Sequence, residues 1–143
     1  MTKDEEFMQE AIGEAKKGKG PKKFGSVVVK NDRIVARAHA TVYEEKDPTK
    51  HAEVKAVSEA AKNLANRRLN GCIIYTTCEP CMMCVGAVLW ARMDKVVYGM
   101  SRKEALELFN DSSHWHMNIE KLVPKGFEIK KGILKEACRE VTI

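Results

Sequence analysis

The sequence has no long apolar run, and no secretory leader is expected from it. No stretch of about 18 apolar residues occurs, so the sequence does not predict a membrane-spanning helix or a membrane partner. The first residues, Met1 to Glu6, are acidic and lack the apolar segment of a secretory signal. Internal repeats and low-complexity linkers are also missing, so residues 1–143 are expected to form one domain around a single core.

The chain has five cysteines, an odd number, and no export signal. They are therefore expected to be reduced thiols in a cytoplasmic protein, free to bind a metal. The net charge of +5 permits an anionic partner without requiring one, because the lysines are spread over the whole chain. A basic run at residues 16–23 could contact phosphate, although a solvated surface is the more ordinary explanation.

Segments of helical and β-strand character alternate along the chain. An amphipathic helix is expected over residues 4–17, and the β-branched strands 24–30 and 33–39 are joined by a turn at Asn31-Asp32. The remaining expected elements are a loop over 41–46, a helix from Asp47-Pro48 to about 66, strands over 72–76, 95–99 and 127–130, helices over 80–90, 102–109 and 133–141, and a loop over 110–118. This order predicts an α/β sandwich around a mostly parallel sheet that begins with an antiparallel hairpin.

The main group of chemically active residues is His51-Ala52-Glu53, followed later by Pro80-Cys81-Met82-Met83-Cys84. Cys81 and Cys84 are spaced i, i+3, so a helix places both thiols on one face, and a helix start near Pro80 favours their thiolate forms. His51 can supply a third zinc ligand, which leaves a fourth position for water, whose pKa zinc lowers toward about 7. Glu53 is then expected to carry protons. Residues i and i+2 do not share a face of a regular helix, so His51 and Glu53 must lie at a helix start.

Cys78 leaves a second explanation open. It could join the other three ligands in a closed, structural zinc site, although it lies before Pro80 and off the expected helix face. A buried thiol that packs as a small hydrophobic group is the simpler interpretation of Cys78, Cys72 and Cys138. For Glu53, the ordinary alternative is an exposed helix carboxylate.

The pattern His-x-Glu followed by Pro-Cys-x-x-Cys is the signature of zinc deaminases. From about residue 24 to residue 99 the chain resembles the cytidine deaminase superfamily, within it the branch that acts on free bases and tRNA. The resemblance includes Asp47-Pro48-Thr49, Thr77-Cys78-Glu79-Pro80-Cys81 and Gly86-Ala87. Bacterial guanine deaminases look most similar, through Trp90-Ala91-Arg92 and a segment like Phe109-Asn110-Asp111.

This resemblance implies a three-layer α/β/α sandwich around a central five-stranded mixed sheet, one Zn²⁺ per chain, and hydrolytic release of ammonia. His51, Cys81 and Cys84 would bind the zinc, and Glu53 would move protons. Backbone N–H groups near Ala52 and Cys81 would face the reacting carbon. The resemblance also implies a homodimer or a higher homo-oligomer that could complete the pocket.

One departure from the family concerns recognition of the substrate. In the family that this chain resembles, guanine and tRNA adenosine deaminases usually carry an asparagine at the end of the second strand, which hydrogen-bonds the base. Counting back from His51 without gaps puts Ala40 at that position. A site built on hydrogen bonds discriminates by the ones that it offers, so the residues do not identify the heterocycle.

Four further residues are candidates for the substrate pocket. Phe24, just before the first strand, is expected to form an apolar wall, with core packing as the alternative. In the loop over 110–118, Trp115 could stack on a heterocycle, and Asp111 could accept hydrogen bonds from its N–H groups. His114 lies beside them as a further candidate, and the alternative for all three is an ordinary surface loop.

The sequence therefore predicts an enzyme, a zinc-dependent aminohydrolase that converts the exocyclic amine of a small nitrogen heterocycle to a carbonyl. A guanine-like free base is the first choice, which would place the enzyme in nucleobase metabolism. Deamination of adenosine in tRNA is the alternative, which the basic run at 16–23 could assist through phosphate contacts. A binding module with a structural zinc is the non-catalytic hypothesis.

Overall fold

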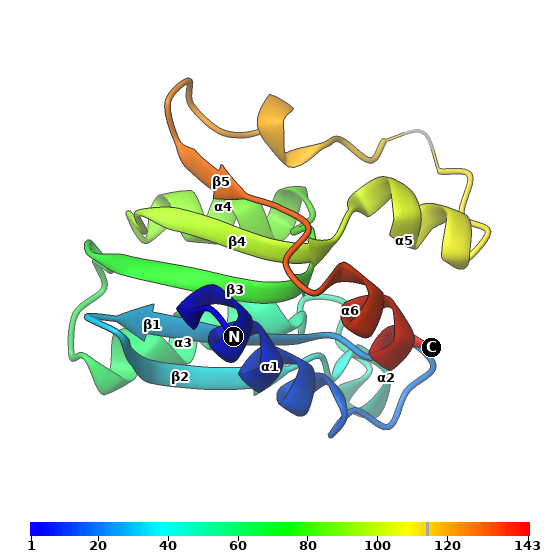
Figure 1. Ribbon diagram of the computed structural model, residues 1–143, viewed down its shortest axis with the longest axis horizontal. Coiled ribbons are helices and arrows are strands. Elements are labelled where there is room, and N and C mark those ends of the chain that lie inside the picture. The colour runs from blue at the N-terminus through cyan, green and yellow to red at the C-terminus, as the bar shows by residue number, and fades with distance from the viewer. Residues whose placement is uncertain (114) are drawn as a thin grey trace.

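The computed structural model describes residues 1–113 and 115–143, which fold around a central five-stranded sheet in the order β2-β1-β3-β4-β5 (Figure 1). The strands are β1 (Gly25–Lys30), β2 (Arg33–His39), β3 (Cys72–Cys78), β4 (Lys95–Met100) and β5 (Glu128–Lys130). Strand β1 is antiparallel to both β2 and β3, whereas β3, β4 and β5 are parallel to one another. The five-stranded mixed sheet is confirmed, with the first hairpin antiparallel as expected.

The β1–β2 hairpin closes through Asn31 and Asp32. Their φ angles are positive, 51° and 61°, as a type I′ turn requires at both central positions. Asn and Asp enter this left-handed region at lower cost than most residues. Lys30 and Arg33 pair across the turn, so the local sequence sets the register of the hairpin.

Helices cover both faces of the sheet. They are α1 (Lys3–Ala15), α2 (Val42–Glu45), α3 (Ala52–Asn63), α4 (Met82–Trp90), α5 (Arg102–Leu108) and α6 (Lys135–Thr142), with a 3-10 turn at Ile119–Lys121. Helices α1 and α6 lie on one face, and α3 and α4 lie on the other (Figure 1). No helix in the described part of the chain has the length and apolar character needed to cross a bilayer.

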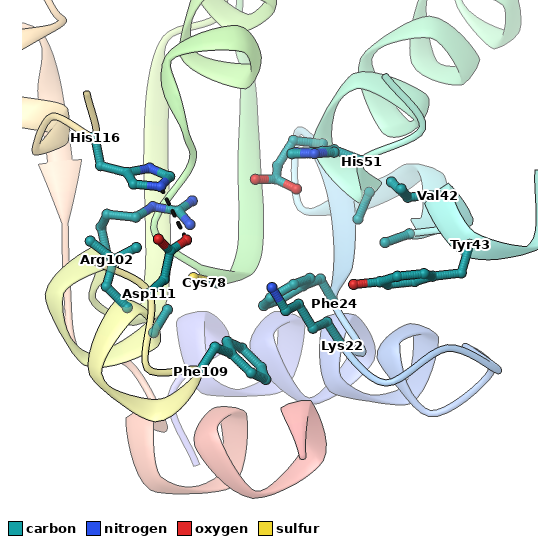
Figure 2. Close-up of a pocket in the computed structure, with 15 residues that line it drawn as sticks. Lys22, Phe24, Val42, Tyr43, His51, Cys78, Arg102, Phe109, Asp111 and His116 are labelled. Carbon is teal, nitrogen blue, oxygen red and sulfur yellow. Dashed lines mark ion pairs between the residues drawn. The ribbon is translucent and has the colours of Figure 1, made fainter. Parts of the chain in front are cut away.

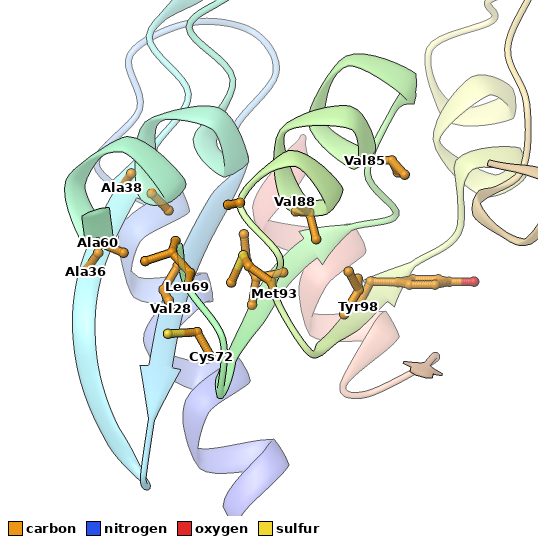
Figure 3. Packing of buried hydrophobic residues seen from close by; sticks show 14 of the residues in the cluster. Val28, Ala36, Ala38, Ala60, Leu69, Cys72, Val85, Val88, Met93 and Tyr98 are labelled. Carbon is orange, nitrogen blue, oxygen red and sulfur yellow. The ribbon is translucent and has the colours of Figure 1, made fainter. Parts of the chain in front are cut away.

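The core has two parts because successive strand residues point to opposite faces. Val28, Ile74 and Val96 pack against α3 and α4 in one cluster, part of which Figure 3 shows. Their neighbours Val27 and Val97 pack against α1 and α6 in a second cluster. The sheet therefore buries both faces, and the three-layer α/β/α sandwich is confirmed.

Several element boundaries differ from the expected ones. Asp47-Pro48 does not begin the long helix: the Asp47 carboxylate instead accepts hydrogen bonds from the backbone and hydroxyl of Thr49, and α3 begins at Ala52 with His51 as its N-cap. Residues 42–45, expected to be loop, form the short helix α2. Helix α4 begins two residues after Pro80, with Cys81 as its N-cap. Local side-chain hydrogen bonds of this kind compete with helix formation and shift such boundaries.

The first turns of α3 and α4 meet beside the end of β3. His51 and Cys81 are both N-cap residues with extended backbone, and neither side chain makes a capping hydrogen bond. Each side chain is therefore free to point away from its own helix. In sheets with parallel strands, ligand sites form at the carboxyl ends of the strands, where β3 and β4 end here.

Candidate active site

Three ligand atoms converge between α3 and α4. The Nδ1 atom of His51 lies 3.6 Å from the sulfur of Cys81 and 3.5 Å from the sulfur of Cys84. The two sulfurs are 3.7 Å apart. Among the described residues, these three are the group of His, Cys, Asp or Glu side chains whose ligand atoms lie close enough together to hold a metal ion. The convergence of His51, Cys81 and Cys84 expected from their spacing is confirmed.

The triangle has the dimensions of one face of a zinc tetrahedron. With Zn–S near 2.3 Å and Zn–N near 2.1 Å, tetrahedral coordination separates two sulfurs by about 3.8 Å and a sulfur from a nitrogen by about 3.6 Å. The observed distances agree within about 0.1 Å of these values. One imidazole and two thiols are also a donor set that zinc prefers. The residues present therefore fit zinc without rearrangement.

The two thiols differ in their affinity for a proton. The hydrogen bond between the Cys81 and Cys84 sulfurs lowers the pKa of Cys81 to about 3 and raises that of Cys84. The Cys81 hydrogen bond raises the pKa of His51, although burial lowers it. Since a metal binds the thiolate and neutral imidazole forms, metal binding displaces the proton that this cluster shares.

Glu53 points into the same region from the first turn of α3. Its side chain is only 5% exposed, so the interpretation as an exposed helix carboxylate is wrong. Burial raises the pKa of Glu53, and the nearby Cys81 thiolate raises it further. A raised pKa makes a carboxyl group a better proton acceptor, which suits a group that accepts and then donates a proton. Glu53 and His51 both line a cavity, and Figure 2 shows the His51 ring at its edge.

A cavity of about 220 Å³ lies directly against Glu53 and His51. Apolar and aromatic side chains from the segment before β1, from α2 and from the end of α5 form one part of its wall: Phe24, Val42, Tyr43 and Phe109. Polar side chains form the opposite part: Arg102, Asp111 and His116 (Figure 2). An apolar slot with a few polar groups on one side suits a flat heterocycle.

Two residues expected at the cavity from the sequence lie there. Phe24 lines it and also contacts the ring of Phe109 edge-on, with centroids 6.4 Å apart, so the wall and the core-packing interpretations both hold. Ala52 lines the cavity as the first residue of α3, where its backbone N–H has no intrahelical acceptor. Ala40, at the position of the family's asparagine, also lines the cavity and offers no polar side chain.

The loop candidates divide. Asp111 lines the cavity, with one carboxylate oxygen 3.5 Å from Nε2 of His116. Trp115 does not line it: the indole is 61% exposed and stacks on the His116 ring, with centroids 4.0 Å apart. His114 lies outside the described residues. A substrate contact for Trp115 or His114 therefore stays a prediction.

Cys78 lines the cavity but is not part of the ligand triangle. Burial raises the pKa of Cys78 to about 12, so it is a neutral thiol in the cavity wall. A neutral thiol packed at the end of β3 is the simpler of the two interpretations given above. The geometry does not support a closed site of four ligands within the described residues.

Glu79 and Arg102 form a support that the sequence did not reveal. The Glu79 carboxylate, 3% exposed, accepts hydrogen bonds from the backbone N–H of Arg102 at 3.1 Å and of Ile119 at 2.8 Å. In return Arg102 donates from Nη2 to the backbone oxygen of Glu79 at 2.6 Å. The zinc-ligand turn is thus tied to α5. One signal in the sequence could have indicated Arg102: it follows β4, which runs parallel to β3, so the ends of both strands lie at the same edge of the sheet.

The sequence pattern of the family described as "Cytidine and deoxycytidylate deaminase zinc-binding region" matches residues 1–100 of this chain. The chain belongs to this family. The deaminase is therefore a hydrolytic enzyme that carries a zinc-binding domain, and His51, Cys81 and Cys84 are positioned to bind one zinc ion. The predicted family, cofactor and class of enzyme are confirmed.

Relatives with two activities are similar to this deaminase. A tRNA-specific adenosine deaminase of Bacillus subtilis is 42% identical over 142 residues, which cover 96% of this chain and 85% of that protein. A guanine deaminase of the same organism is 44% identical over 98 residues, which cover 68% of this chain and 63% of that protein. The deaminase thus spans less than two thirds of that guanine deaminase.

Solved structures show the same fold. One, from a study of A-to-I editing by tRNA:A34 deaminases, is 27% identical with a TM-score of 0.72 and covers 95% of this chain and 98% of its own. The X-ray structure of the B. subtilis guanine deaminase is 42% identical with a TM-score of 0.67, covering 73% of this chain and 68% of its own.

Proposed function

We propose that this deaminase acts on adenosine in tRNA, forming inosine and ammonia. The observation that carries the proposal is the similarity to a tRNA-specific adenosine deaminase over nearly the whole of both chains. The match to guanine deaminase covers a smaller part of both proteins. The order given from the sequence, guanine-like base first and tRNA adenosine second, is therefore reversed.

The position of the basic run supports an RNA substrate. Lys22, near its end, lines the cavity with its ammonium 4.7 Å from the centroid of the Phe109 ring. Figure 2 shows Lys22 and Tyr43 beside one another at the cavity. The run at 16–23 therefore leads to the cavity, and its lysines can neutralise the phosphates that flank a base bound inside.

The chemistry follows from the residues around the cavity. Zinc held by His51, Cys81 and Cys84 supplies a Lewis acid that activates water at neutral pH. Glu53 takes a proton from the attacking water and gives it to a ring nitrogen of the base. After the C–O bond has formed, Glu53 transfers the second proton to the amine, the C–N bond breaks and ammonia leaves. Burial raises the pKa of this carboxyl group above its usual value, the direction that suits a proton carrier.

The test uses zinc-loaded protein and three variants. Glu53→Ala is expected to keep one zinc per chain and to lose turnover by at least about 10²-fold, because a general acid–base group contributes about 10²–10⁴-fold. Glu53→Gln should behave in the same way, since it keeps the shape without the proton transfer. Glu59→Gln is the control: the residue has the same type and lies on the exposed face of the same helix. The measurement is inosine formed in an anticodon stem-loop, together with released ammonia.

A guanine-like free base is the second candidate. It is favoured by the small volume of the cavity and by Asp111 in its wall, a carboxylate that can accept from the N–H groups of such a base. Ammonia released from guanine but not from the stem-loop would replace the first proposal with this one. Wild-type activity in Glu53→Ala would contradict the proton-carrier role for either substrate.

Two further predictions accompany the proposal. A homodimer or a higher homo-oligomer remains expected from the family resemblance, and the cytoplasm remains the expected compartment. Sedimentation of the zinc-loaded protein tests the first.

A further inference from the structure

A second pocket, of about 400 Å³, adjoins the active-site cavity. Arg102, Leu106, Asp111 and His116 line both of them, so these side chains form the boundary between the cavity and the outer pocket. Lys103 lines the outer pocket but not the active-site cavity. A ligand larger than a base can therefore place its ring beside Glu53 and another group across this boundary.

Two buried polar atoms at the boundary have no hydrogen-bond partner. They are Nε of Arg102 and Nε2 of His116. Among the described residues, these two are the buried side-chain nitrogen or oxygen atoms without a hydrogen-bond partner. Arg102 is held by Nη2, through its bond to Glu79, so its guanidinium is fixed in place while Nε stays unused. Buried polar groups are rarely left without partners, because each costs free energy. Nε of Arg102 therefore lacks an acceptor, and Nε2 of His116 has only the Asp111 carboxylate nearby, at 3.5 Å.

The chemistry of the wall favours a phosphate as that acceptor. A guanidinium presents several N–H donors in a plane, which match the oxygens of a phosphate. Lys103 adds a second positive charge on the outer side, where Glu107 contributes a negative one. Ala40, across the cavity, offers no polar side chain to the substrate.

We propose that Arg102 and His116, with Lys103 beside them, bind a phosphate group of the nucleotide substrate at this boundary. The proposal rests on the proposed function, since it names the group that accompanies the reacting base. The phosphate has two possible sources, a phosphodiester of RNA or the 5′-phosphate of a free mononucleotide. Arg102 would thus determine that the enzyme acts on nucleotides in preference to free bases.

Asp111 makes the direction of one affinity change a test of the proposal. One of its oxygens accepts from the backbone and hydroxyl of Ser113, at 2.9 and 2.6 Å, and the other lies 3.5 Å from His116 without a hydrogen bond. A carboxylate here repels a phosphate held by His116. Asp111→Asn is therefore expected to tighten binding of a phosphate-bearing ligand several-fold, whereas an Asp111 that accepts from the base predicts weaker binding.

The experiment measures binding without turnover. Zinc-loaded Glu53→Ala protein is titrated with adenosine, adenosine 5′-monophosphate and an anticodon stem-loop at several salt concentrations. Adding Arg102→Gln should weaken binding of the phosphate-bearing ligand about 10–100-fold, as loss of a charged hydrogen bond predicts. For the stem-loop, the slope of log K against log salt should also fall by about 0.7, the value for one phosphate contact to a single strand. Adenosine binding should not change.

The matched control is Arg67→Gln, which removes the same charge from an exposed residue after the far end of α3. It should change affinity by less than about twofold, because charges beyond the screening length interact little. If Arg102→Gln fails to fold by circular dichroism, Lys103→Gln and His116→Asn replace it, and each should weaken the same ligands.

The outcomes separate the possibilities. Sensitivity to Arg102→Gln with the monophosphate identifies a mononucleotide 5′-phosphate, and sensitivity with the stem-loop alone identifies an RNA phosphodiester. An equal loss for adenosine, an unchanged salt slope, or no binding of either phosphate-bearing ligand overturns the phosphate site. Failure of the proposed function is distinct: the wild type would bind these ligands and form no inosine.

Discussion

Replacement of Glu79 by alanine should lower the free energy of unfolding, although Glu79 is not a zinc ligand. Glu79 belongs to the turn between β3 and α4, yet its carboxylate bonds two backbone N–H groups far along the chain, at Arg102 and Ile119. Ile119 is fully buried, and Glu79 itself is 3% exposed. Removing the carboxylate leaves both donors without an acceptor, and at Ile119 water cannot replace it.

The expected loss follows from these two bonds. Each orphaned buried donor costs about 1–3 kcal/mol, which gives about 2–6 kcal/mol for the pair. Because Arg102 N is only partly buried, water can recover some of its share, and we expect about 4 kcal/mol for Glu79→Ala. Glu79→Gln keeps one acceptor oxygen, so about 2 kcal/mol should be lost. Glu120→Ala, an exposed neighbour of Ile119, is the control and should stay within about 0.5 kcal/mol of the wild type.

The assay is urea unfolding followed by circular dichroism at a fixed excess of free zinc, since bound zinc adds to the stability of the folded state. The free energies of unfolding of wild type and variants are compared at equal zinc concentration. A loss below about 1 kcal/mol for Glu79→Ala would refute the reasoning, because it would mean that the two donors find other partners. A loss in Glu120→Ala as large as in Glu79→Ala would do the same.

Three further changes test other parts of the structure. Cys84→Ser should lower the zinc content well below one per chain after dialysis, because the hydroxyl is a poor zinc ligand, whereas Cys72→Ser, away from the triangle, should keep its zinc. Gly25→Ala should destabilise the protein by about 3 kcal/mol or more in urea unfolding, because the new Cβ would lie 2.1 Å from a backbone oxygen of α1; unchanged stability would contradict this packing. Burial raises the pKa of Asp4, but hydrogen bonds from Lys130 and Tyr75 outweigh this and lower it. The wild type should therefore lose stability as the pH falls from about 4 through the lowered pKa, and Asp4→Asn should remove that part of the pH dependence.

Local signals predicted the sheet and most of its helices. The Asn31-Asp32 turn, the strand over 24–30 and the helix over 80–90 all depend on neighbours in sequence, and the structure contains them with small shifts of their ends. The start of α3 was wrong by several residues. Asp47 before Pro48 has the composition of a helix cap, but its side chain bonds Thr49 in a turn of its own, a choice that composition alone does not distinguish.

The polar wall of the cavity was predicted only in part: Asp111 was a candidate from the sequence, whereas Arg102 and His116 were not. Asp111 and His116 come from one loop, Arg102 begins α5, and the cavity opens where these meet Phe24 from the start of β1. No spacing in the sequence links these positions. Trp115, the most conspicuous residue of that loop, lies outside the cavity, because its neighbour His116 turns inward and the indole stacks on the outer side.

The sequence by itself determined the ligand set, the proton carrier proposed for it and the family. A histidine, a glutamate two positions later and a Pro-Cys-x-x-Cys segment are enough, because the chemistry of zinc restricts which side chains can bind it and the spacing restricts their geometry. The sequence also predicted that His51 lies at a helix start, but only the tertiary structure decided that this helix adjoins the one that begins after Cys81, that Glu79 ties the turn to α5, and that Arg102 faces the cavity. These facts depend on contacts between segments far apart in sequence, and those contacts form only when burial of the two core clusters brings the layers together.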